Sequence, residues 1–92
     1  MHLEIVTPEE ILLSSEVKSV TVPGAMGDFQ MMDNHAPIVS LLQEGYVKVD
    51  GDVTLDKKNE QKFSRDQDSH LRIKIKGGVV EMKDNKAIVL VD

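Results

Sequence analysis

The sequence predicts an all-β protein, an antiparallel β-sandwich or flattened barrel of about eight to ten short strands. Its apolar residues are mainly valine, isoleucine and leucine, and the β-branched ones suit a pleated sheet better than a helix. Several short segments alternate apolar and polar residues with a period of two, and glycine or proline separates them. No stretch of about ten residues has the 3.6-residue period of an amphipathic helix.

Length and composition indicate one small soluble domain, residues 1–92, with a single core and little room for a deep cavity. The absence of cysteine excludes disulfides and thiolate metal ligands. No apolar run approaches the ~20 residues of a membrane helix, so we expect no direct membrane insertion. With a formal net charge of −5 we expect no nucleic-acid partner, because phosphate backbones bind basic surfaces.

The first strand is predicted at His2–Ile5, where Leu3 and Ile5 face one side. The next segment, residues 7–10, reads Thr-Pro-Glu-Glu and has the pattern of a capping box. It predicts at most one helical turn, and a short second strand follows.

A further strand is predicted over residues 16–23, with Val20 and Val22 on one face. Val17 falls on the polar face of this strand, which requires either a bulge or burial of both faces. Pro23-Gly24 ends the strand with the chemistry of a type II turn.

Residues 38–43 are almost continuously apolar, which predicts a fully buried strand. The following strand, residues 46–49, places Val47 and Val49 on one face.

The clearest alternation is at residues 71–76, where Leu71, Ile73 and Ile75 face the core and three cations face water. Gly77-Gly78 interrupts it. Two last strands, at 79–83 and 86–91, flank Asp84-Asn85, a dipeptide that tolerates positive φ and predicts a two-residue hairpin turn.

Residues 50–70 differ in composition from the rest of the chain. Ten of these 21 residues are charged, and the large apolar residues are only Val53, Leu55 and Phe63. The segment predicts an exposed loop or hairpin insertion; the alternative is a docking element.

No catalytic, metal or cofactor site is predicted. The serines lack a Gly-x-Ser-x-Gly elbow or a paired base. Asp28, Asp33 and His35 could converge on one cation, but such residues more often form turns. Gly24–Gly27 lacks the Gly-Lys-Ser/Thr of a phosphate-binding loop.

Surface recognition is left as the predicted function, because adaptable apolar residues lie close together at positions 26–32. Core packing is the favoured role for Phe29 and Met31, whereas Met26, between two glycines, is expected to be exposed.

Residues 20–42 resemble the N-terminal domain of the epsilon subunit of bacterial F-type ATP synthases. The resemblance rests on Val22-Pro23-Gly24, on Gly27-Asp28 and on His35-Ala36-Pro37-Ile38. The flanks, residues 1–15 and 77–92, resemble the opening strands and the closing hairpin of that family.

The resemblance implies a non-catalytic rotor subunit that binds the gamma subunit and the c-ring and couples proton translocation to ATP synthesis. It implies a peripheral position at the cytoplasmic face of the bacterial plasma (inner) membrane. The residues implied to contact the c-ring are Met26, Gly27, Asp28 and Phe29. Those implied to contact gamma are His35, Ala36, Pro37 and Ile38, of which the last two set the backbone.

The chain also departs from the family. Gln30 stands where the family usually has glycine, and Asp33-Asn34 stands where it usually has Pro-Gly. Typical members continue into a two-helix hairpin, which in some bacteria binds ATP, so we expect a short form that has no helical domain and binds no ATP. The alternative function is a free-standing β-sandwich that binds another protein.

Overall fold

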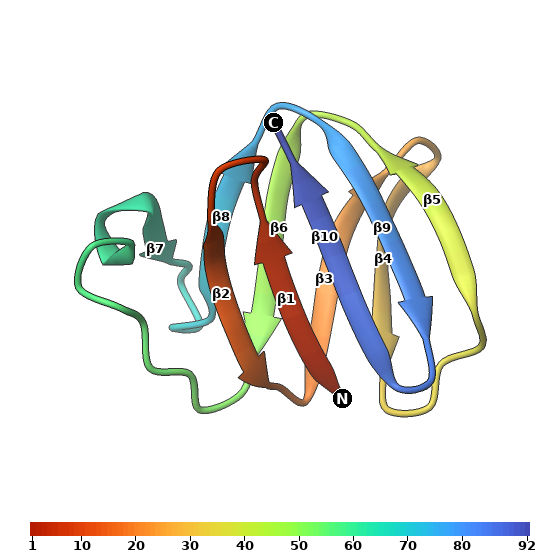
Figure 1. Cartoon of the computed structure of the whole chain (residues 1–92), viewed down its shortest axis with the longest axis horizontal. Coiled ribbons are helices and arrows are strands. Elements are labelled where there is room, and N and C mark those ends of the chain that lie inside the picture. Colours follow the sequence, from red (N-terminus) through yellow and green to blue (C-terminus); the bar gives the residue numbers. More distant parts are fainter.

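The computed structural model describes residues 1–92 as ten strands in one sheet, which curls so that its two halves face each other (Figure 1). The strands are β1 (His2–Val6), β2 (Ile11–Glu16), β3 (Ser19–Gly24), β4 (Gly27–Met32), β5 (Ile38–Leu42), β6 (Gly45–Asp50), β7 (Phe63–Arg65), β8 (Leu71–Ile75), β9 (Gly78–Lys83) and β10 (Lys86–Val91). The only helix is a 3-10 turn, η1 (Glu60–Lys62). The all-β prediction is therefore confirmed.

The strand order divides into two halves. The first half contains β2-β1-β10-β9-β5, and the second contains β4-β3-β6-β8-β7. They join where Gly24 of β3 pairs with Leu42 of β5. All pairings are antiparallel except that of β1 with β10, which brings the first and last strands together in parallel.

The core between the halves consists of 21 buried apolar residues. Strand alternation places every second residue there, and each predicted inward set is confirmed: Leu3 and Ile5, Val20 and Val22, Val47 and Val49, and Leu71, Ile73 and Ile75. A register shift opposite β1 adds one residue to β2, so that both Leu12 and Leu13 are buried.

Of two predicted turns, the one at residues 7–10 is compatible with the structure and the one at Pro23-Gly24 is displaced. Residues 7–10 form no helix: the Thr7 hydroxyl accepts the N–H groups of Glu9 (3.3 Å) and Glu10 (3.1 Å), but the chain then enters β2 directly. The turn predicted at Pro23-Gly24 lies two residues later, at Ala25-Met26, and the positive φ belongs to Gly27. Pro23 and Gly24 remain in β3 because both pair with β4.

The strand predicted over residues 16–23 begins only at Ser19. Val17 and Lys18 form a link whose N–H groups donate to the carbonyls of Met1 (2.9 Å) and Asp50 (2.7 Å). Val17 is buried but lies outside β3, so neither a bulge nor burial of both strand faces is needed to account for it.

The prediction that residues 38–43 are fully buried is wrong. Ile38, Ser40 and Leu42 of β5 face inward, whereas Val39 and Leu41 are 70% and 71% exposed. The five strands of the first half cover the core with their inner face only, so the other face of β5 has nothing packed on it.

Residues 51–62 pass along the side of the sandwich between β2 and β7 (Figure 1, left). The Asn59 side chain is buried and donates to the carbonyl of Ile11 (3.3 Å). Lys62 pairs with Glu10 (2.8 Å), and Val53 and Leu55 pack against the core. Residues 51–62 therefore cover an open side of the core. The rest of the charged segment includes β7, which forms a hairpin with β8.

The hairpin at Asp84-Asn85 is confirmed, with φ of 52° and 60° at its two turn residues. No helix in the structure is both long enough and apolar enough to span a membrane.

Prediction: Gly78→Ala will lower the free energy of unfolding by at least about 2 kcal/mol, because its Cβ would lie 2.1 Å from the Leu90 carbonyl oxygen. This loss corresponds to a melting temperature lower by about 10 °C or more in a domain of this size. Thermal denaturation followed by circular dichroism measures it.

Gly77→Ala is the matched control, since its Cβ would meet nothing closer than 3.5 Å. Equal melting temperatures for the two variants would contradict the prediction.

Candidate functional site

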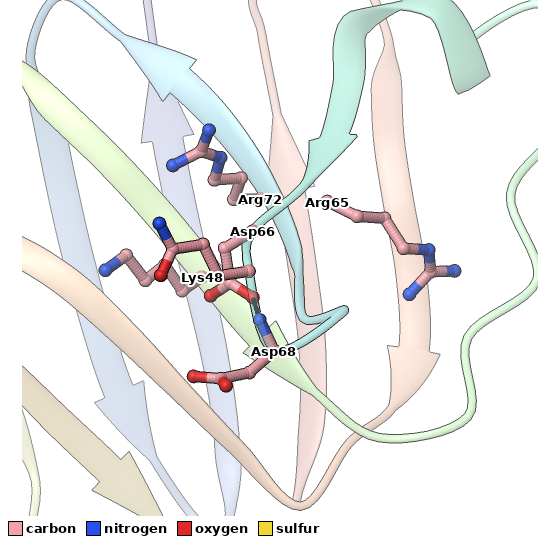
Figure 2. A pocket seen from close by; sticks show the side chains of 6 residues that line it. Lys48, Arg65, Asp66, Asp68 and Arg72 are labelled. Carbon is pink, nitrogen blue, oxygen red and sulfur yellow. Dashed lines mark hydrogen bonds between the residues drawn. The ribbon is translucent and has the colours of Figure 1, made fainter.

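One large hollow of the surface is polar. A hollow of about 530 Å³ lies outside β6 and the β7–β8 turn and is lined by Lys48, Arg65, Asp66, Gln67, Asp68 and Arg72 (Figure 2). None of its lining residues is apolar, and Arg65 points away from the others. The hollow lacks the apolar walls that usually enclose a small-molecule ligand.

Asp66 is the acidic centre of this turn. Its Oδ1 accepts the N–H groups of Asp68 and His70, both at 2.9 Å, and these bonds are the main reason that its pKa is below the usual value. Asp66, Asp68 and His70 present ligand atoms within 4.8 Å of one another, but the turn already uses Asp66. The hypothetical cation site at Asp28, Asp33 and His35 does not form, because β4 separates Asp28 from the other two.

The predicted c-ring residues form one end of the β3–β4 hairpin. Met26 is fully exposed at the turn, and Gly27 has a φ of 116°. Phe29 lies half-buried over Gly24, where an added Cβ would be 2.7 Å from the ring. With Asp28 exposed, the tip presents one apolar side chain and one carboxylate on a fixed hairpin.

The predicted gamma residues lie at the other end of β4, in the β4–β5 connection. His35 Nδ1 lies 2.7 Å from the Ala36 carbonyl oxygen, and Ala36 and Pro37 are exposed. Asn34, with a φ of 61°, donates its N–H to Asn85 Oδ1 (2.7 Å). The structure thus places the two sets at opposite ends of β4.

The connection is held to the N-terminus by charge. The Met1 α-amino group pairs with Asp33 and lies 3.4 Å from Glu16. The hydrogen bond that the amino group donates to Asp33 is the largest influence on its pKa, which is raised above its ordinary value despite the opposing effect of burial.

Sequence reasoning missed an apolar surface on the outer face of the first half-sheet. Five aliphatic residues stand opposite one another on consecutive strands: Leu41, Val79, Leu90, Val6 and Ile11. This aliphatic row includes some of the most exposed apolar side chains of the chain, with Leu41 at 71%, Ile11 at 54% and Leu90 at 48%.

The continuous run at residues 38–42 was the available signal for this surface. Its non-alternating apolar residues indicate two apolar faces, and only one of them could be covered by the core of so short a chain. The outward face of β5 carries Val39 and Leu41. It is the end of the aliphatic row that lies next to the His35–Ile38 connection.

The chain matches known proteins over its whole length. The model of the family described as "ATP synthase, Delta/Epsilon chain, beta-sandwich domain" matches residues 1–92. The ATP synthase epsilon chain of Campylobacter fetus subsp. fetus (strain 82-40) is 39% identical over 95 residues, covering 100% of this chain and 60% of the relative. That of Chlorobium limicola is 39% identical over 90 residues, covering 98% and 86%.

Solved structures agree in fold. A chain in the central stalk and c-ring structure of Tetrahymena thermophila mitochondrial ATP synthase superposes with a TM-score of 0.71 at 16% identity. The match covers 99% of this chain and 62% of that one. A chain of the Euglena gracilis mitochondrial ATP synthase gives 0.72 at 17% identity, covering 97% and 48%.

Prediction: the free energy of unfolding will decrease as pH rises above about 8, the unfolded value for an α-amino group. A group whose folded pKa is raised stabilises the fold fully below its unfolded pKa and loses this effect as pH passes its folded pKa. Asp33→Asn will lower stability at pH 7 and flatten the decline above about pH 8, as measured by urea denaturation.

Asp52→Asn, which removes an exposed carboxylate in a different segment, is the control and is expected to keep the native slope. Parallel pH profiles for the native chain and Asp33→Asn would contradict a role for the pair.

Proposed function

The chain belongs to the β-sandwich family of ATP synthase delta and epsilon chains, and we propose that it is a non-catalytic subunit of the central stalk. It binds the gamma subunit and the c-ring and so couples proton translocation to ATP synthesis. The single observation that carries the proposal is the family match over residues 1–92. Its position is peripheral, at the cytoplasmic face of the bacterial plasma membrane, where it is held by its partners.

The gamma subunit is proposed to cover the His35–Ile38 connection and the outer face of β5. The support is continuity: the connection leads directly into β5, where Val39 and Leu41 extend the aliphatic row across the first half-sheet. An apolar face of this extent is costly to leave in water and is typical of a surface that a partner covers.

The c-ring is proposed to meet the tip formed by Met26, Gly27, Asp28 and Phe29. This tip lies at the far end of β4 from the proposed gamma contact, so the two partners would not compete for one surface. The β3–β4 hairpin is paired along its whole length, from Ser19–Met32 to Gly24–Gly27, and can therefore carry load between them.

Prediction: replacing both Val39 and Leu41 with glutamate will weaken binding to the purified gamma subunit at least ~10-fold, because two charges must then be desolvated at the contact. Size-exclusion chromatography with light scattering measures the one-to-one complex. Both side chains are about 70% exposed, so the fold is expected to persist.

Met26→Glu, at the tip, is the control and should bind gamma normally. If the native chain failed to bind gamma at micromolar concentrations and was recovered from cells without the membrane fraction, the free-standing binding module would replace the proposal.

Prediction: Asp28→Lys will reduce retention of the chain on purified c-ring–gamma complexes. Its melting temperature will stay within about 2 °C of the native value, because Asp28 is exposed and has no ion pair. The reduction is expected to be modest, a few-fold, since a rim charge contributes little alone. Asp52→Lys has the same charge change in another segment. Equal retention of both variants would exclude Asp28 from the contact.

A further inference from the structure

The outer face of the second half-sheet has a character opposite to that of the first. Lys48 on β6 stands directly opposite Arg72 on β8, and Tyr46 stands opposite Lys74. The Arg72 guanidinium lies 4.2 Å and the Lys74 ammonium 5.1 Å from the centre of the Tyr46 ring. We call Lys48, Arg72 and Lys74, with Tyr46 between them, the cationic strip.

The three cations of the strip form no salt bridge, although acidic residues outnumber basic ones in the chain. The sequence has 16 acidic and 11 basic residues, yet none of the three cations has a carboxylate oxygen within 4.0 Å. Lysines elsewhere do form such pairs, among them Lys62 and Lys86. Because like charges opposite each other on neighbouring strands destabilise a sheet, the fold does not require this arrangement.

Arg72 is held in one orientation. Its guanidinium stacks on Tyr46, and its Nε donates to the Ser64 hydroxyl (3.3 Å) on β7. Its two terminal nitrogens have no partner in the chain, since the Ser64 contact is its only side-chain hydrogen bond. A planar guanidinium presented in this way is suited to bidentate binding of a carboxylate.

Acidic residues limit the strip at one end. Asp66 and Asp68, in the β7–β8 turn, lie beside Lys48 in the hollow of Figure 2. Asp66 is committed to its own turn, where its Oδ1 accepts two backbone N–H groups and its Oδ2 lies 3.6 Å from His70. Arg72 also borders this hollow, so binding of an anion is most favourable toward Lys74, the cation of the strip that does not line it.

We propose that the cationic strip binds an acidic segment of a partner protein. Arg72 and Lys74 are alternate residues of β8, so their Cα atoms are about 6.6–6.8 Å apart, the same repeat as alternate residues of an extended acidic segment. An anionic lipid surface is disfavoured, because a chain of net charge −5 is repelled by an extended negative surface, whereas a short segment contacts only the strip. The proposal does not depend on the chain's place in the ATP synthase.

The test is an NMR titration of the isotopically labelled chain with a hexaglutamate peptide at about 20 mM salt. Shift changes are expected on the outer residues of β6 and β8, with binding several-fold weaker at about 150 mM NaCl. The double variant Arg72→Gln/Lys74→Gln is expected to lose at least ~5-fold in affinity. Arg72→Lys, which keeps the charge but not the planar fork, is expected to bind more weakly than the native chain.

The matched control is Lys57→Gln/Lys83→Gln, which removes two exposed cations from other parts of the surface. Equal loss of affinity in the two double variants would overturn the proposal, because net charge alone would then explain binding. Peptide-induced shifts outside the strip would also overturn it. Binding to phosphatidylcholine–phosphatidylglycerol vesicles without peptide binding would overturn it in favour of a lipid surface. Unchanged spectral dispersion shows that each variant is folded.

Discussion

The structure depends on one aliphatic core that both halves of a single curled sheet share. With 92 residues there is enough apolar material for 21 buried side chains and no third layer. Most strands therefore contribute one face to the core and expose the other, whereas β3 is buried along almost its whole length. The inner positions are determined by packing, because a change of even one methylene is felt there. The outer positions are free of that requirement, so their composition carries information about partners.

The two outer faces use this freedom in opposite ways. The first half-sheet presents the aliphatic row, and the second presents the cationic strip around Tyr46. Neither surface is needed to close the core. The aliphatic row is costly to expose to water, and the like charges of the cationic strip repel one another. A small domain with two dissimilar outer faces offers two different surfaces to other proteins. This character agrees with membership of a family named for ATP synthase subunits.

The ends of the sandwich are tied by contacts between residues distant in sequence. The Met1 amino group pairs with Asp33, and Asn85 in the β9–β10 turn accepts the N–H of Asn34. The connection that contains His35 is thus positioned by the first residue and by the closing hairpin together. At the other side, Asn59 and Lys62 attach the charged segment to the β1–β2 region. Local sequence signals describe none of these ties.

The sequence by itself determined the all-β class, the inward residues of most strands and the Asp84-Asn85 hairpin, because alternation and turn chemistry are local properties. Strand β4 was not assigned as a strand, although core packing was favoured for Phe29 and Met31, and of these Met31 is buried and Phe29 half-buried. Only the tertiary structure decided that β1 and β10 pair in parallel, that Pro23-Gly24 stays within a strand, and that Val39 and Leu41 face outward. These outcomes depend on which strands become neighbours, and an apolar run does not reveal which of its faces the core covers.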